Sequence, residues 1–250
     1  MTVQVPAAKA PFRLMGVDIR IQPNVVILMA VIAWSLVPGE MGMAAVTGAN
    51  VWLMLAVVVL GLGLSILLHE MGHTLVGRAF GMKIDHITLH VFGGVASFSQ
   101  GPKTPLSELL MAIAGPAVSV VLAGLFWLLS GLAADETLPR AFGYLFQINL
   151  GLAIFNMLPA FPMDGGRVLR SLIWMFTRNP RLATSIAATL GMAFGVLLML
   201  GGAAMIVSGS GFVSGAWMIV MGLMVANIAR AARPRRAARS AVPPTDQAEA

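Results

Sequence analysis

Six apolar stretches separated by short polar segments restrict what this chain can fold into more than any other feature. They are roughly Val25–Val37, Val51–Gly77, Pro105–Ala133, Ala141–Leu158, Leu182–Ser208 and Phe212–Ala229. Most of them approach the ~20 residues that a helix needs to cross a bilayer. Only 10% of the residues are charged, whereas an ordinary soluble domain carries about 25%. We therefore predict an all-α polytopic membrane protein whose six transmembrane helices form one domain over residues 24–229.

The basic residues predict how these helices are oriented. With six spans, fifteen of the sixteen Lys and Arg residues fall on one side of the membrane, and only Arg140 falls on the other. Because Lys and Arg concentrate in cytoplasmic segments, we expect both termini in the cytoplasm and the protein in the cell (inner) membrane. Residues 1–23 then form a cytoplasmic segment, and residues 230–250 a basic, disordered tail. Basic segments beside anionic lipid explain the net charge of +6 without a nucleic-acid partner.

Residues 82–100 differ from the rest of the chain, because β-branched and apolar residues are mixed there with polar ones and Gly93-Gly94 interrupts the run. This pattern predicts a small β-ribbon between the second and third spans, near the cytoplasmic face. It is the only strand-like stretch in the sequence. An exposed strand edge could pair with an unwound substrate segment through Val91, Gly93, Gly94 and Val95. A ribbon that only closes the cytoplasmic opening is the alternative.

The segment His69-Glu70-Met71-Gly72-His73 places three ionisable side chains near the end of the second span. Residues four apart lie on one face of a helix. Two imidazoles so placed can bind one zinc ion, and the glutamate between them can take a proton from water as the catalytic base. Ionisable groups inside a span are costly and usually functional, which argues against these being ordinary polar residues at a helix end.

A zinc site needs a third protein ligand, and Asp164 is the candidate. A catalytic zinc usually has three protein ligands, and the chain has no cysteine. Apart from Glu70, Asp164 is the acidic residue that we place at membrane depth. It follows Pro159 and Pro162, which end a helix, and precedes Gly165-Gly166, which permit close backbone approach. We therefore expect a non-helical loop that lines a cavity and presents Asp164 to the metal.

With these motifs, the chain resembles the site-2 protease family of intramembrane zinc metalloproteases. The resemblance covers about residues 50–229 and rests on His69 through His73 and on Asn156 through Gly165, with support from 89–94 and Gly115-Pro116. It implies one Zn²⁺ per chain, held by His69, His73 and Asp164, and hydrolysis of peptide bonds in membrane-spanning substrate proteins. The position of Asn156 in its motif implies a hydrogen bond to the oxyanion, although capping of its helix is an equal alternative.

Two other functions fit parts of the pattern. A metal-ion transporter would also place His and Asp inside spans, but it gives no special role to Glu70. An inactive protease-like scaffold would lack a ligand or the base, and none is missing here. His86 and His90 lie four apart in the ribbon, and we interpret them as structural or close to substrate. Gly115-Pro116 predicts a kink in the third span, and the Gly-x-x-x-Gly segments at 191–195 and 211–215 predict helix packing.

Overall fold

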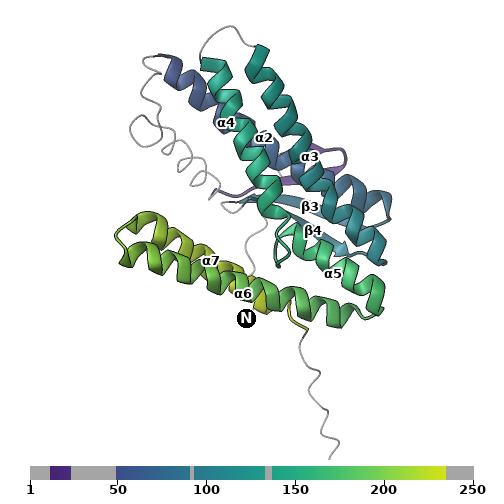
Figure 1. The fold of residues 1–250 in the computed structure, drawn as a ribbon. Coiled ribbons are helices and arrows are strands. Elements are labelled where there is room, and N and C mark those ends of the chain that lie inside the picture. Colours follow the sequence, from purple (N-terminus) through teal and green to yellow (C-terminus); the bar gives the residue numbers. More distant parts are fainter. Residues whose placement is uncertain (1–11, 24–48, 91–92, 133–136, 235–250) are drawn as a thin grey trace, which may run out of the picture.

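The computed structural model describes residues 12–23, 49–90, 93–132 and 137–234. In these ranges it contains six helices and four strands (Figure 1). The strands are β1 (Phe12–Leu14), β2 (Val17–Ile21), β3 (Lys83–His90) and β4 (Gly93–Gln100), and the helices are α2 (Ala49–Ala79), α3 (Pro105–Leu132), α4 (Thr137–Asn156), α5 (Asp164–Thr177), α6 (Pro180–Val207) and α7 (Phe212–Ala232). The predicted first span, Val25–Val37, lies outside the described residues.

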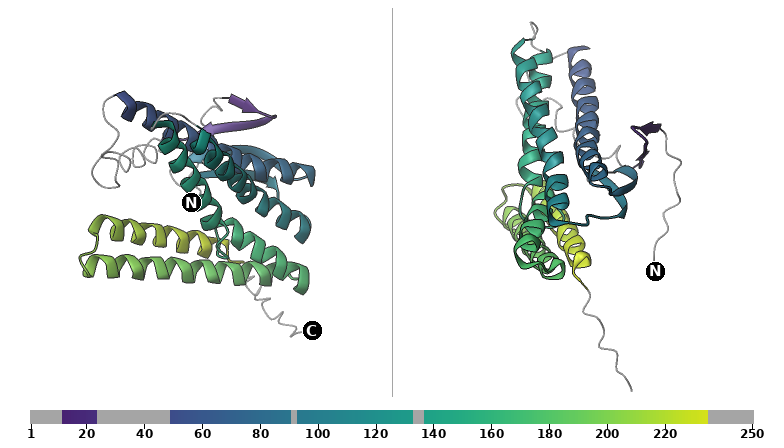
Figure 2. Two further views of the ribbon diagram at one scale, coloured as in Figure 1. Left: turned by 45° about the horizontal axis from the view of Figure 1, so that its top comes forward. Right: turned by 90° about the vertical axis from the view of Figure 1, so that its right-hand side faces the viewer.

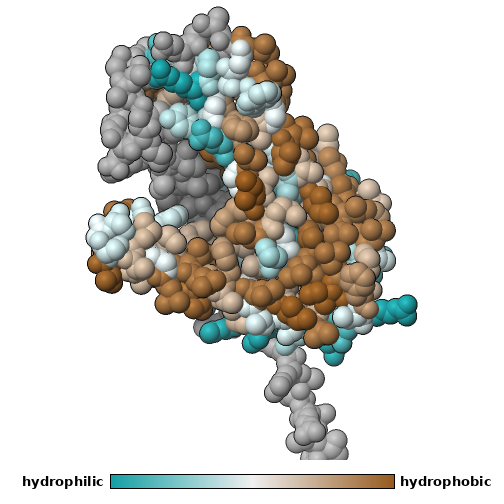
Figure 3. All heavy atoms as spheres, in the orientation of Figure 1, coloured by the Kyte–Doolittle hydropathy of each residue, from teal (hydrophilic) through white to brown (hydrophobic). Residues whose placement is uncertain are grey.

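Four of these helices are long and apolar enough to cross a membrane: α2, α3, α6 and α7. Their surfaces carry large apolar side chains that water would not tolerate in such numbers. Leu60, Val121 and Leu197 are 74%, 69% and 64% exposed, and hydrophobic side chains cover much of the face shown in Figure 3. The protein is therefore a multi-pass membrane protein. The predicted fourth span corresponds to α4, which has 20 residues but falls outside this set of four.

Helices α2, α3 and α4 pack side by side (Figures 1 and 2). Their contacts depend on glycines of α2. A Cβ built on Gly72 would lie 2.9 Å from the carbonyl oxygen of Ala114 on α3, and one on Gly61 would lie 2.6 Å from a methyl group of Leu145 on α4. Close approach of helix backbones is the usual means of association in lipid, where the hydrophobic effect is weak.

Helices α6 and α7 form an antiparallel hairpin set at an angle to the other three long helices (Figure 2). Their glycines interdigitate: Gly195 lies against Gly222, and Gly202 against Gly215. The packing role predicted for Gly191, Gly195 and Gly215 is therefore confirmed, since a Cβ at any of these positions would come within 3.0 Å of another part of the protein. Gly211 is different, because it precedes α7 as its N-cap.

The ribbon predicted at residues 82–100 is present as the antiparallel pair β3–β4, but it is half of a four-stranded sheet in the order β1-β2-β3-β4. The expectation that no other segment is strand-like was wrong. Strands β1 and β2 form a hairpin whose turn, Met15-Gly16, has two positive φ angles, as type I′ turns require. Val17 and Ile19 of β2 are buried with Ile87 of β3 against α2. Burial of these side chains explains why a short, charged segment becomes strand.

The connection between α4 and the hairpin also differs from expectation. Helix α4 ends at Asn156, before Pro159, as predicted. However, Asp164 is the first residue of α5 rather than part of a loop. The glycines that favoured a loop instead allow close packing, because a Cβ on Gly165 would lie 2.5 Å from the carbonyl oxygen of Leu158 and one on Gly166 would lie 2.6 Å from the amide nitrogen of Phe161. The turn before α5 therefore folds back onto the first turn of the helix.

Candidate metal centre

The two histidines of α2 lie one helical turn apart and face the same neighbour. His69 and His73 are both 4% exposed. Their rings stand edge to face, with centroids 4.9 Å apart, and their Nε2 atoms are 3.2 Å apart. The predicted arrangement of the His-Glu-x-x-His segment on one helix face is therefore present.

Asp164 completes a triangle of donor atoms. Its Oδ2 lies 3.3 Å from Nε2 of His69 and 3.2 Å from Nε2 of His73, and the side chain is buried. In a tetrahedral zinc site with bonds of about 2.0–2.1 Å, neighbouring ligand atoms are about 3.3 Å apart. The donor set and its separations therefore fit Zn²⁺ with a fourth position left for water or substrate. Among the described residues no other cluster of three such side chains has this arrangement.

Helix α3 orients both rings through their second nitrogen. Nδ1 of His73 donates to the main-chain carbonyl of Met111 at 2.7 Å, and Nδ1 of His69 lies 2.9 Å from Oγ of Ser119. A hydrogen at Nδ1 leaves the Nε2 lone pair available for a metal. Ser119 is a candidate orienting residue that the sequence did not indicate. Its available signal was a polar residue inside an apolar helix, four positions after Gly115.

Gly115 lies between these two partners on the same face of α3. A Cβ at this position would collide with Nε2 of His73 and lie 2.7 Å from Nε2 of His69. The helix continues through Pro116, and the kink expected at Gly115-Pro116 stays a prediction. The chief role of Gly115 in this structure is steric, because only glycine leaves room for the donor atoms of both rings.

Glu70 lies on α2 between the two histidines and within electrostatic range of His73, His69, Asp164 and Arg167. It is partly exposed, whereas the histidines are buried. A carboxylate in this place can exchange a proton with a water molecule beside the metal without occupying a ligand position. The geometry thus separates a candidate base from three candidate ligands.

The remaining residues singled out in the sequence lie elsewhere or remain untested. Asn156 donates from Nδ2 to the carbonyl of Leu152 at 3.0 Å, a bond within its own helix. His86 lies 3.4 Å from a guanidinium nitrogen of Arg20; burial lowers the pKa of this imidazole, and the Arg20 charge lowers it further. Gly93, Gly94 and Val95 belong to β4, while Val91 lies outside the described residues.

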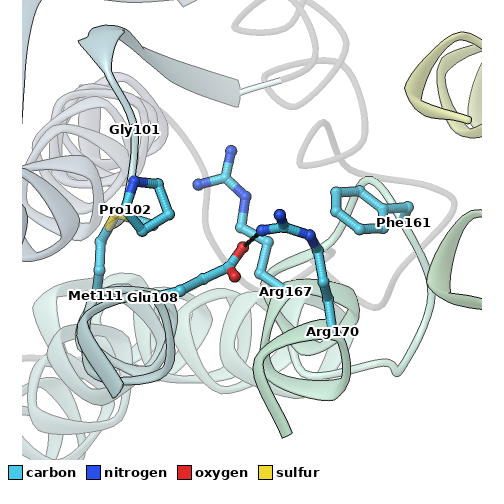
Figure 4. Close-up of a pocket in the computed structure, with 7 residues that line it drawn as sticks. All are labelled: Gly101, Pro102, Glu108, Met111, Phe161, Arg167 and Arg170. Atoms are coloured by element: carbon cyan, nitrogen blue, oxygen red, sulfur yellow. Dashed lines mark hydrogen bonds and ion pairs between the residues drawn. The ribbon is translucent and has the colours of Figure 1, made fainter. Parts of the chain in front are cut away.

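A pocket of about 210 Å³ opens beside the centre. Figure 4 shows its lining, which comes from the segment after β4, the start of α3, the turn before α5, and α5 itself. The residues are Gly101, Pro102, Glu108, Met111, Phe161, Arg167 and Arg170. Met111 lies in this wall and also provides the carbonyl that accepts from His73. Met111 therefore connects the wall of the pocket to the hydrogen bond that orients His73.

The sequence profile of peptidase family M50 matches residues 57–135 and 129–200, a region that holds all three donors and Glu70. The chain belongs to peptidase family M50. Two relatives, each named "putative zinc metalloprotease", come from Synechocystis sp. and Mycobacterium tuberculosis. The first is 36% identical over 74% of this chain and 49% of its own length. The second is 32% identical over 87% of this chain and 56% of its own length.

A solved structure supports the same family. The site-2 protease from Methanocaldococcus jannaschii has a TM-score of 0.63 and 28% sequence identity, and the match covers 89% of this chain and 94% of that one. The resemblance to site-2 proteases drawn from the motifs is thus confirmed. The chain spans about half the length of the curated M50 relatives it matches.

Proposed function

We propose that this chain is a zinc-dependent intramembrane endopeptidase that hydrolyses peptide bonds of membrane-spanning proteins. The main support is the triangle formed by Nε2 of His69, Nε2 of His73 and Oδ2 of Asp164, whose sides are 3.2, 3.2 and 3.3 Å. His69, His73 and Asp164 would hold one Zn²⁺. Glu70, beside the donors, would be the catalytic base. Neither a transporter nor an inactive scaffold accounts for a complete ligand set with a base beside it.

Each residue has a distinct role in the proposed reaction. When bound, zinc supplies a Lewis acid that polarises the scissile carbonyl and activates water near neutral pH. Glu70 accepts the proton of the attacking water as the new C–O bond forms, and delivers it to the nitrogen as the C–N bond breaks. Met111 and Ser119 hold the imidazoles in orientation. Asn156 donates one amide hydrogen to Leu152, and the second hydrogen of the same NH2 group would be the donor to the oxyanion.

Substrate would bind as an added strand at β4. A helical peptide bond is shielded by its own hydrogen bonds, so the substrate must unwind, and its exposed amides need partners in an apolar setting. β4 ends the described sheet, pairing with β3 on one side only, and both strands contact α2. Its outer edge at Gly93 to Val95 is therefore suited to pair with such a segment, and Val91 stays a predicted contact from the sequence.

In the proposed topology the protein crosses the cell (inner) membrane six times, and both of its termini lie in the cytoplasm. β2 pairs in parallel with β3, which follows the C-terminal end of α2. Helix α2 begins at Ala49 and has 31 residues, a length of about 46 Å. Ile21 and Ala49 therefore lie towards opposite ends of α2, which supports the first span predicted from the sequence. The apolar α4 would be the fourth.

The test of the proposed function is the replacement Glu70→Gln. The variant should purify with zinc like the unaltered chain but cleave no membrane-protein substrate, because it loses the base and keeps the ligands. The substrates would be identified as membrane proteins that accumulate uncut in cells carrying this variant. Cleavage at the unaltered rate by Glu70→Gln, or a purified chain without bound zinc, would rule out the proposal.

A further inference from the structure

A partly buried ion pair joins the helix that orients the histidines to the helix that carries Asp164. Nη1 of Arg170 on α5 donates to Oε1 of Glu108 in the first turn of α3, and Figure 4 shows the pair in the wall of the pocket. Nε of the same guanidinium donates to Oγ1 of Thr184 on α6 at 2.8 Å. The guanidinium also lies 5.5 Å from the ring centre of Trp174. Arg170 therefore fastens α5 to two other helices.

The two members of this pair stand close to the metal donors along their own helices. Glu108 precedes Met111, whose carbonyl accepts from His73, by about one turn of α3. Arg170 follows Asp164 by about two turns of α5. Because a helix is rigid over such lengths, fixing Glu108 to Arg170 also fixes how far Asp164 lies from the imidazoles that α3 orients.

The burial of Glu108 favours one position of α5 relative to α3. Glu108 is 3% exposed, and its second oxygen, Oε2, has no hydrogen-bond partner within the described part of the chain. Its carboxylate thus depends chiefly on Arg170 for compensation, with a smaller contribution from the charge of Arg167. A buried pair adds little net stability, but separating it leaves an uncompensated charge. A shift of α5 along α3 would therefore be resisted more strongly than apolar contacts alone would resist it.

We propose that Glu108 and Arg170 are positioning residues that set Asp164 at its distance from His69 and His73. Neither residue belongs to the group of donors that could hold the metal. This inference rests on the proposed function only in taking Zn²⁺ as the metal that the three donors hold. It predicts that loss of the pair weakens metal binding while the helices stay folded.

The experiment measures zinc affinity of the purified full-length chain in detergent, by competition with a chromophoric chelator. In the double variant Glu108→Gln with Arg170→Gln both charges are removed, so no buried charge is left unpaired. We expect zinc affinity to fall by about 10- to 100-fold, as for other residues that orient metal ligands. The absorption spectrum of bound Co²⁺ should change as well, because the third donor is displaced. Helix content and the melting temperature of the metal-free chain should stay close to the unaltered values.

Two further variants make the result decisive. Arg170→Lys keeps the charge but loses the planar fork, so its zinc affinity should lie between those of the unaltered chain and the double variant. Arg181→Gln removes an exposed arginine at the start of α6 and should change nothing. The inference fails if the double variant, or Arg170→Lys where the double variant does not fold, binds zinc as tightly as the unaltered chain. No cleavage is measured, so this failure is distinct from failure of the peptidase proposal.

Discussion

At the scale of single residues, the candidate metal centre consists of three donor side chains that would not stabilise the folded protein in the absence of a metal. Asp164 and the two histidines are buried with their donor atoms 3.2–3.3 Å apart. Polar groups gathered in this way are costly unless something compensates them. A metal ion does so, and each donor should be needed to bind it.

We predict that Asp164→Ala, His69→Ala and His73→Ala each abolish peptide cleavage and purify with much less zinc than the unaltered chain. A site with two protein ligands is incomplete, so each variant should lose activity because it no longer holds the metal. Metal analysis of the purified variants checks this. Glu70→Gln is the matched control, since it should lose activity with its zinc retained. Normal zinc content in Asp164→Ala would remove the assignment of the third ligand.

Gly115 gives a second prediction at this scale. In Gly115→Ala the new methyl group would meet the Nε2 atoms of both histidines, so we expect about 10- to 100-fold weaker zinc binding. Gly124→Ala, in the same helix, is the control, because a Cβ there has no neighbour within 4 Å. Chelator competition on both proteins measures the difference. Equal zinc affinity for the two variants would contradict a steric role for Gly115.

At the scale of elements, α3 supports the metal centre although it carries no proposed ligand. Its face bearing Met111, Gly115 and Ser119 contacts the two histidines, and its first turn holds α5 through Glu108. The sheet is the other supporting element. Its inner face packs on α2, which places β4 near the helix with the metal-binding histidines.

We predict that proline at Val91 or Val95 weakens cleavage without changing zinc content, because each substitution removes one backbone donor from the proposed substrate edge. Arg13→Pro serves as the control: it alters β1, at the opposite edge of the described sheet, and should leave cleavage unchanged. Cleavage rates and zinc content of the purified variants provide the comparison. A proline scan of Ile87–Ser97 with normal cleavage throughout would exclude strand pairing to this ribbon.

At the scale of the whole molecule, the distribution of charge and the parallel pairing of β2 with β3 both bear on how the chain crosses the membrane. Arg13 and Arg20 lie in the same sheet as Lys83, so these three basic residues share one side. In the proposed topology that side is the cytoplasm, because Lys and Arg concentrate in cytoplasmic segments.

We predict that cysteines introduced at positions 40 and 135 are labelled only from outside the cytoplasm, whereas one at position 175 is labelled only from within it. The chain contains no cysteine, so single replacements give no background. A membrane-impermeant thiol reagent applied to intact cells and to inverted vesicles checks the assignment. Labelling of positions 40 and 175 from the same side would contradict the six-span topology.

The sequence determined the parts of this protein that depend on local patterns. Four predicted spans match α2, α3, α6 and α7 within a few residues, since apolar length alone makes a helix the favourable state in lipid. The spacing of four in His69-Glu70-x-x-His73 was enough to place both imidazoles on one face. Asp164 was identified by elimination, because it was the remaining acidic residue that could lie near that helix.

The tertiary structure decided what depends on contacts between distant segments. Strand β2 is buried by pairing with β3, 68 residues later at Ile19 and Ile87, and no local pattern records such a partner. Gly165 and Gly166 favour a loop by composition, but packing against the preceding turn makes them helical. Likewise, Gly115 and Ser119 gain their roles only when α3 lies against α2. The sequence indicated the candidate donors, whereas packing between helices set the distances among them.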